Sequence, residues 1–143
     1  MVNVIQAMIL TAKEKMLLTP TYHVFDMYQP FQDASPYPIS VSGPHYDYGA
    51  YSLPAVDASA AKSKDGKVYL ALVNLDPHRS ADIATNWTGR AQGTILTGPA
   101  MDAHNTFDAP ETLRPMPFSG IRRSSGNVTF TLPAKAVAVL SIE

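Results

Sequence analysis

The chain has 143 residues, of which 45% are hydrophobic and 16% are charged, and its formal net charge is −1. This composition predicts a globular chain with about one domain-sized core, and it excludes a disordered chain and any electrostatic basis for binding nucleic acid or an anionic membrane surface. The absence of cysteine excludes disulfide bonds and zinc–thiolate sites, and it leaves a cytoplasmic or an exported location equally open.

The first 32 residues predict an α/β pattern that follows the order helix, strand, helix. Apolar residues at helical spacing predict the end of an amphipathic helix, namely Val2, Ile5, Met8 and Ile9. A polar turn at residues 11–15 precedes a short predicted strand at residues 16–18, which ends before Pro20. Thr21 is the predicted cap of a second helix. The apolar side of that helix is expected to comprise Val24, Phe25, Tyr28 and Phe31.

From about residue 36 the pattern changes to β. Residues 36–43 begin with prolines, which favours an edge strand or a linker. The pair Asp65–Gly66 predicts a hairpin between strands at residues 56–61 and 67–74. Further strands are expected over residues 80–85, 93–97, 128–132 and 136–142. Both alternating sets are apolar in residues 68–73, which predicts a central strand covered on both faces, and this set of short strands indicates a β-sandwich.

The histidines show no metal-ligand spacing, so no metal site is expected. His104 lies between Asp102 and Asn105, and this group could bind an ion or sugar hydroxyls. The alternative is that these polar side chains bond the backbone of their own loop, which is the interpretation we favour because Asp and Asn do so commonly in turns.

Several segments resemble the C-terminal part of glycoside hydrolase family 51 α-L-arabinofuranosidases. The loop Met101–Glu111 (MDAHNTFDAPE) and the following Arg114–Phe118 (RPMPF) are similar to a late loop of the family's C-terminal β-sandwich. Val2–Leu10 (VNVIQAMIL) and Met16–Phe25 (MLLTPTYHVF) resemble the end of its catalytic barrel, and Tyr51–Val56 (YSLPAV) resembles the start of the sandwich. The resemblance runs from Met1 to Glu143, but it covers only the last part of a much longer enzyme.

The resemblance implies a mainly β fold in two parts. Residues 1–35 would be the last elements of a catalytic (β/α)₈ barrel, and residues 36–143 would form a jelly-roll-like C-terminal β-sandwich. The parent enzyme would release terminal α-L-arabinofuranosyl residues from arabinan or arabinoxylan with retention, and without a metal or organic cofactor. The implied partners are the barrel portion, in the same enzyme or as a second chain, an arabinose-containing saccharide, and further subunits of an oligomer.

Retaining hydrolysis needs two carboxyl groups about 5–5.5 Å apart. The glutamates of this chain are Glu14 in a lysine-flanked turn, Glu111 in the proline-bearing loop, and Glu143 at the last position. None of them matches the family's catalytic glutamates, which lie on earlier barrel strands. We therefore expect no catalytic residue here, and we expect this chain alone to be inactive and to act as a scaffold.

Thr19 and Tyr22 are the predicted substrate-binding residues. Residues 16–18 resemble the last barrel strand, and active sites of such barrels lie at the C-terminal ends of the strands. The hydroxyls of Thr19 and Thr21 would then face a furanose, and the ring of Tyr22 could contact the sugar. The alternative is that Thr21 only caps the helix and Tyr22 packs in the core.

Two other functions stay open at this point. Trp87 and the tyrosines at positions 37, 46, 48 and 51 are consistent with a carbohydrate-binding β-sandwich module, although packing of these rings at the interface with the barrel is preferred. The chain is also consistent with the non-catalytic half of a split glycosidase. Whether the barrel belongs to the same polypeptide or to a second one, the apolar side chains of residues 1–32 are expected to form a docking surface for it.

Overall fold

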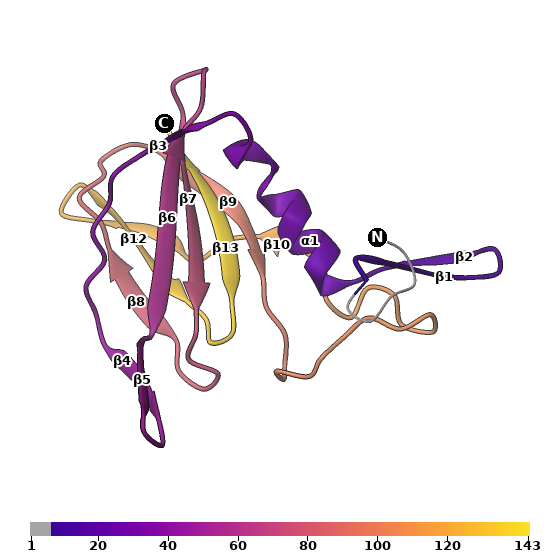
Figure 1. Cartoon of the computed structure of the whole chain (residues 1–143). Coiled ribbons are helices and arrows are strands. Elements are labelled where there is room, and N and C mark those ends of the chain that lie inside the picture. Colours follow the sequence, from indigo (N-terminus) through magenta and orange to yellow (C-terminus); the bar gives the residue numbers. More distant parts are fainter. Residues whose placement is uncertain (1–6) are drawn as a thin grey trace.

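The computed structural model describes residues 7–143, which form a β-sandwich with one helix packed outside it (Figure 1). A six-stranded antiparallel sheet has the order β10 (Met116–Pro117), β9 (Ala91–Leu96), β13 (Val137–Ile142), β7 (Val68–Asn74), β6 (Val56–Lys62) and β3 (Ser35–Pro36). A three-stranded sheet has the order β11 (Ile121–Ser124), β12 (Asn127–Leu132) and β8 (Ala81–Ala84). The mainly β sandwich expected from the sequence is thus confirmed.

Two hairpins stand outside the sandwich (Figure 1). The N-terminal hairpin pairs β1 (Ile9–Ala12) with β2 (Lys15–Leu18), and a second hairpin pairs β4 (His45–Tyr48) with β5 (Tyr51–Pro54). Helix α1 (Pro20–Met27) and the 3₁₀ helix η1 (Gln29–Phe31) follow β2. No helix within residues 7–143 has the length and apolar character needed to cross a membrane.

The strand expectations from residue 56 onward are confirmed. Gly66 has a φ of +90° in the turn between β6 and β7, a backbone conformation that glycine adopts without steric cost. Strand β7 lies between β13 and β6 in the centre of the sheet. In β12 the side chains of Val128, Phe130 and Leu132 are buried, whereas Thr131 is exposed. Residues 36–43 are mostly a connection, since only residues 35–36 pair with β6.

The six-stranded sheet has an apolar core on each face. Between the two sheets, Leu70 and Leu72 of β7 pack with Leu140 of β13 and with Phe130 and Leu132 of β12. The opposite face is covered by α1, η1 and the loop between β9 and β10, in a second cluster. The sheet members of that cluster are Ala71, Leu96 and Val139. Alternate residues of the same strands therefore serve two different cores, as their continuous apolar sequence predicted.

The start of the chain differs from the expectation. Ile9 lies in strand β1 instead of a helix, and the polar turn of residues 11–15 shortens to Lys13 and Glu14 because Thr11 pairs with Met16 and Ala12 with Lys15. Met8 directly precedes this strand, while Val2 and Ile5 lie outside the described residues. The strand expected at residues 16–18 is present, but its described partner is β1 in an antiparallel hairpin.

Thr19, not Thr21, caps helix α1. Thr19 has an extended backbone (φ −85°, ψ 164°), and its side-chain oxygen accepts a hydrogen bond from the Tyr22 N–H. Pro20 occupies the first turn, where its missing N–H costs no helical hydrogen bond and its fixed φ suits the helix. The helix therefore begins two residues earlier than expected, and Thr21 is exposed.

The apolar face of α1 also differs by one residue from the expected face. The residues that pack on the sheet are Val24, Met27, Tyr28 and Phe31. Phe25 is 65% exposed, because a rotation of about 100° per residue places it outside this stripe. Burial raises the pKa of the Tyr28 hydroxyl, and the nearby Asp57 carboxylate adds to this shift. Val24, Tyr28 and Phe31 are therefore partly buried on the sandwich, whereas the expectation placed them against an absent barrel.

A group of buried hydrogen bonds around Asn74 lies at the end of β7. The side-chain nitrogen of Asn74 donates to the carbonyls of Arg79 (2.9 Å), Leu132 (3.2 Å) and Pro133 (2.9 Å), while its oxygen accepts from the Asp76 N–H (3.0 Å). Asp76 in turn accepts from the backbone N–H groups of the next turn. These bonds join the two sheets at one end of the sandwich.

Core truncation should destabilise the fold strongly. Leu140 is fully buried between the sheets, so Leu140→Ala should lower the free energy of unfolding by about 2–5 kcal/mol through lost burial and a residual cavity. Leu75→Ala is the matched control, because Leu75 is 42% exposed and its loss should cost no more than about 0.5 kcal/mol. Urea unfolding followed by circular dichroism measures both. Equal effects of the two substitutions would contradict this core assignment.

Asp76 should make the stability depend on pH. The N–H groups of His78 and Arg79 lower the pKa of its carboxyl below 3.8, so the carboxylate stabilises the fold above that pH and loses this effect as the pH falls through the folded-state pKa. Asp76→Asn should lower stability at pH 7 and flatten the decline of stability as the pH falls through the folded-state pKa of this carboxyl. Asp108→Asn, in an exposed loop, is the control. An unchanged slope for Asp76→Asn in urea unfolding would refute the assignment.

Candidate functional site

The predicted substrate-binding residues lie where the N-terminal hairpin meets the loop of residues 97–115, which we call the junction loop. The hydroxyl of Thr19 lies 3.0 Å from the carbonyl oxygens of both Ala7 and Met8, and it accepts from the Tyr22 N–H at 3.5 Å. The Thr19 N–H also donates to the Met8 carbonyl at 3.0 Å. Thr19 thus fixes the start of α1 against the segment that precedes β1.

Tyr22 is half-buried on the first turn of α1. Its ring lies edge-on to the ring of His23, with centroids 5.7 Å apart and an interplanar angle of 81°. Thr19 and Tyr22 are therefore brought together by the helix cap, whereas Thr21 is exposed beside them. These contacts give Thr19 a structural role, and sugar binding by Thr19 and Tyr22 stays a prediction.

Asn105 ties the junction loop to the N-terminal hairpin. Its side chain is buried, and its nitrogen donates to the carbonyls of Leu18 and Leu113, both at 2.9 Å. Its oxygen accepts from the Leu113 N–H at 2.7 Å. The bond to Leu18 crosses 87 residues of sequence and reaches the residue before Thr19. Asn105 is thus the central polar contact of this junction.

The loop arrangement supports the backbone-bonding interpretation of Asp102, His104 and Asn105. The ring nitrogen Nδ1 of His104 lies 2.8 Å from the Asp102 carbonyl oxygen, and Asn105 points inward to backbone partners. Residues 7–143 contain no group of three or more His, Asp or Glu side chains arranged to hold a metal ion.

The three glutamates occupy different places in the fold. Glu14 lies in the turn between β1 and β2. Glu111 forms an ion pair with Arg114 (3.0 Å), and Glu143 forms one with Lys67 (2.9 Å). The Lys67 ammonium lowers the pKa of the Glu143 carboxyl through a side-chain hydrogen bond and its charge. The three glutamates therefore lie on three different elements, and two of them are held in separate ion pairs.

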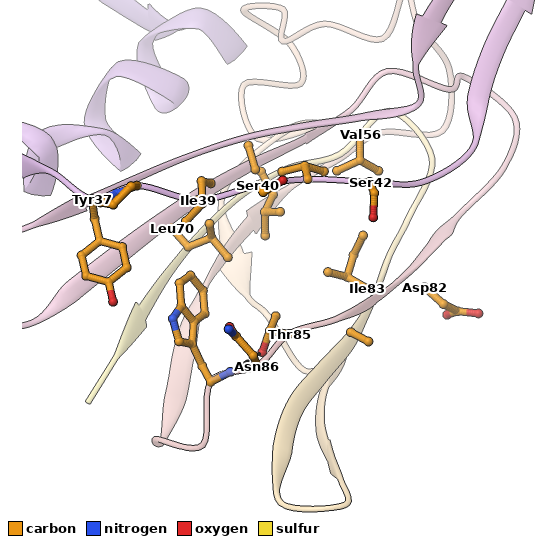
Figure 2. A pocket seen from close by; sticks show the side chains of 16 residues that line it. Tyr37, Ile39, Ser40, Ser42, Val56, Leu70, Asp82, Ile83, Thr85 and Asn86 are labelled. Carbon is orange, nitrogen blue, oxygen red and sulfur yellow. Dashed lines mark hydrogen bonds between the residues drawn. The ribbon is translucent and has the colours of Figure 1, made fainter.

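A separate cavity of about 480 Å³ opens at the edge of the sandwich between β6 and β8 (Figure 2). Residues 37–42, which we call the covering segment, lie over it, and residues 82–87 form the opposite wall. Apolar side chains of both sheets form its floor, including Val56, Leu70 and Ile83. Trp87 also lines it and packs against the core between the sheets, so its ring belongs to the sandwich itself.

Sequence reasoning did not identify this cavity. Its walls come from the covering segment, from β6 and β7, and from β8 with the turn that follows it. These segments are far apart in the sequence, and only the pairing of the strands brings them together. The only signal was the interpretation of Trp87 and several tyrosines, Tyr37 among them, as consistent with a carbohydrate-binding module, because the sequence does not show that Trp87 and Tyr37 share one site.

The chain is similar to known α-L-arabinofuranosidases over its whole length. The family model for the alpha-L-arabinofuranosidase C-terminal domain matches residues 1–136. An intracellular exo-alpha-L-arabinofuranosidase of Bacteroides ovatus is 36% identical over 147 residues, which cover 99% of this chain and 29% of that protein.

Solved structures agree with this match. The glycoside hydrolase family 51 arabinofuranosidase of Xanthomonas axonopodis pv. citri superposes with a TM-score of 0.93 at 45% identity, covering 100% of this chain and 30% of that one. The alpha-L-arabinofuranosidase of Thermotoga maritima, solved as an arabinose complex, shares the fold with a TM-score of 0.80 at 22% identity. The chain spans about 30% of the length of these relatives. It therefore belongs to the C-terminal domain family of the glycoside hydrolase family 51 α-L-arabinofuranosidases.

Proposed function

We propose that this chain is the non-catalytic C-terminal portion of an α-L-arabinofuranosidase and that it completes and supports the catalytic barrel. The observation that carries the proposal is the 45% identity to the Xanthomonas enzyme over the whole chain, with a TM-score of 0.93. In this proposal residues 1–35 contribute the last barrel elements, and residues 36–143 form the sandwich domain that holds them.

The reaction proposed for the whole enzyme is retaining hydrolysis of terminal α-L-arabinofuranosyl residues in arabinan or arabinoxylan. Two carboxyl groups suffice for this chemistry, one as nucleophile and one as acid/base. Both would come from the barrel portion, since Glu111 and Glu143 are held in separate ion pairs here. Thr19 would act by holding the last loop of the active face in position, and the half-buried ring of Tyr22 would contact the furanose.

The barrel would dock on the side that carries the N-terminal hairpin, α1 and the junction loop, which lie together in Figure 1. Each of these three elements has a large apolar side chain that is mostly exposed: Met16 (63%), Phe25 (65%) and Met101 (72%). Exposed apolar groups on neighbouring elements are typical of interaction surfaces. Helix α1 would then lie between the two domains, with one side on the sandwich and Phe25 toward the barrel.

The hairpin of β4 and β5 is the surface we propose for contacts between subunits. Cross-strand pairing places Tyr46 opposite Leu53 and Tyr48 opposite Tyr51, so these side chains share one face of the hairpin. The rings of Tyr48 and Tyr51 are 73% and 75% exposed. An isolated two-stranded hairpin is only marginally stable in water, so a second subunit covering this apolar face would stabilise it.

The junction can be tested in a chimera in which this chain replaces the corresponding C-terminal part of the Xanthomonas enzyme. We expect the chimera to hydrolyse a chromogenic arabinofuranoside.

Within this chimera, Asn105→Ala should leave the buried backbone groups of Leu18 and Leu113 unpaired, which costs about 2–4 kcal/mol. The substitution should therefore lower both the melting temperature and the activity. His104→Ala, at the exposed neighbouring position, is the control and should change neither. A folded but inactive chimera, or identical behaviour of the two variants, would argue against the proposed support of the barrel.

The chain by itself should show no arabinofuranosidase activity. The reason is that none of its three glutamates matches the catalytic pair of the family, so turnover of the chromogenic substrate should equal the buffer rate. Supplying the barrel portion as a second polypeptide should restore turnover if the junction assembles in trans. Turnover by the chain alone that is abolished by Glu14→Gln, Glu111→Gln or Glu143→Gln would overturn the scaffold role.

A further inference from the structure

We propose that the cavity between β6 and β8 is a non-catalytic binding site for a neutral saccharide, with room for about one or two sugar units. It lies between the two sheets, among residues of the core cluster shared by both sheets, whereas α1 and the junction loop cover the other face of the six-stranded sheet. The cavity is therefore separate from the surface proposed to meet the barrel.

The cavity presents aromatic side chains from two opposite walls. The backbone of Trp87 is held on both sides, because its N–H donates to the Thr85 hydroxyl (3.2 Å) and its carbonyl accepts from the Val128 N–H (2.8 Å). The Tyr37 N–H donates to the Ala60 carbonyl (2.9 Å), which fixes the start of the covering segment on β6. Both residues line the cavity. The C–H faces of a sugar ring pack well on such rings and on the apolar floor.

The rim supplies hydrogen-bonding groups that the described part of the protein does not use. Ser40, Ser42 and Asn86 line the cavity, and none of their side chains has a hydrogen-bond partner among residues 7–143. Figure 2 shows Ser40 and Ser42 on the covering segment and Asn86 on the opposite wall. This combination of donors and acceptors over an apolar floor matches the amphipathic surface of a sugar.

Charge excludes the main alternatives for the ligand. No lysine or arginine lines the cavity within the described residues, and the Asp82 carboxylate accepts a hydrogen bond from the exposed Thr131 hydroxyl on the outer face of the three-stranded sheet, so no cation in the cavity would hold an anionic ligand such as a phosphate or a uronic acid. A purely apolar ligand would remove water from the rim groups without replacing their hydrogen bonds, which is costly. A neutral polyhydroxylated ligand satisfies both requirements.

The proposal can be tested on the full chain without any barrel. Isotope-labelled protein is titrated with arabinobiose and with xylobiose, and the indole N–H signal of Trp87 and the side-chain amide of Asn86 are followed by NMR. We expect saturable shifts of both signals at millimolar saccharide with at least one of the two sugars, while backbone signals of Tyr48 and Tyr51 on the distant hairpin stay unchanged.

Two variants separate binding from folding. Asn86→Ala removes a rim group, and Ser42→Phe fills the cavity, so each should weaken binding roughly fivefold or more without lowering the melting temperature. Thr88→Ala is the matched control, because Thr88 is exposed next to Trp87 and does not line the cavity. The absence of saturable shifts with either sugar, or unchanged affinity in both variants, would overturn the site. Because no activity is measured, such a failure would leave the chimera result and the proposed scaffold role unaffected.

Discussion

The fold depends on one constraint, which is that both faces of the central six-stranded sheet are apolar and must be covered. Strands β7 and β13 place Leu70 and Leu140 on one face and Ala71 and Val139 on the other. The three-stranded sheet covers the first face, and α1 with the junction loop covers the second. Removing either covering layer would expose several buried side chains, and each large apolar side chain that is fully buried contributes about 1.5–3 kcal/mol to the free energy of folding. The sandwich and the helix that precedes it are therefore energetically one unit.

This constraint is the physical basis of the proposed scaffold role. Because α1 packs on the sheet, its first residue is held at a defined place. The Thr19 cap bonds the first turn of the helix, and the Asn105 side chain bonds the Leu18 carbonyl at the end of β2. In the proposed enzyme, the position of the last barrel elements would thus be set by the sandwich core. Activity in the barrel and stability of the sandwich would then be coupled through a few hydrogen bonds at the junction.

The same two-layer arrangement creates the cavity. At the edge between β6 and β8 the two sheets are not joined by a shared strand, and the covering segment bridges the opening. At the end of β7, the Asn74 side chain donates to the carbonyls of Leu132 and Pro133 at the end of β12 and so ties the sheets directly. Buried hydrogen bonds therefore join the sheets at the end of β7, while the open edge beside β6 and β8 presents aromatic and polar side chains to solvent.

The sequence alone determined the strands with strong local signals. The Asp65–Gly66 turn, the doubly apolar β7 and the alternation of β12 are encoded by neighbouring residues, and the family resemblance rests on short contiguous segments. It also led to the prediction that the chain alone is inactive, because none of its three glutamates matches the catalytic pair of the family that it resembles. Only the tertiary structure decided which residues meet, because Asn105 bonds Leu18 across 87 positions, and the cavity combines three distant segments. Local periodicity misplaced Ile9 in a helix and grouped Phe25 with the helix residues that pack on the sheet, since pairing with β2 and the orientation of α1 on the sheet are set by contacts that no local pattern records.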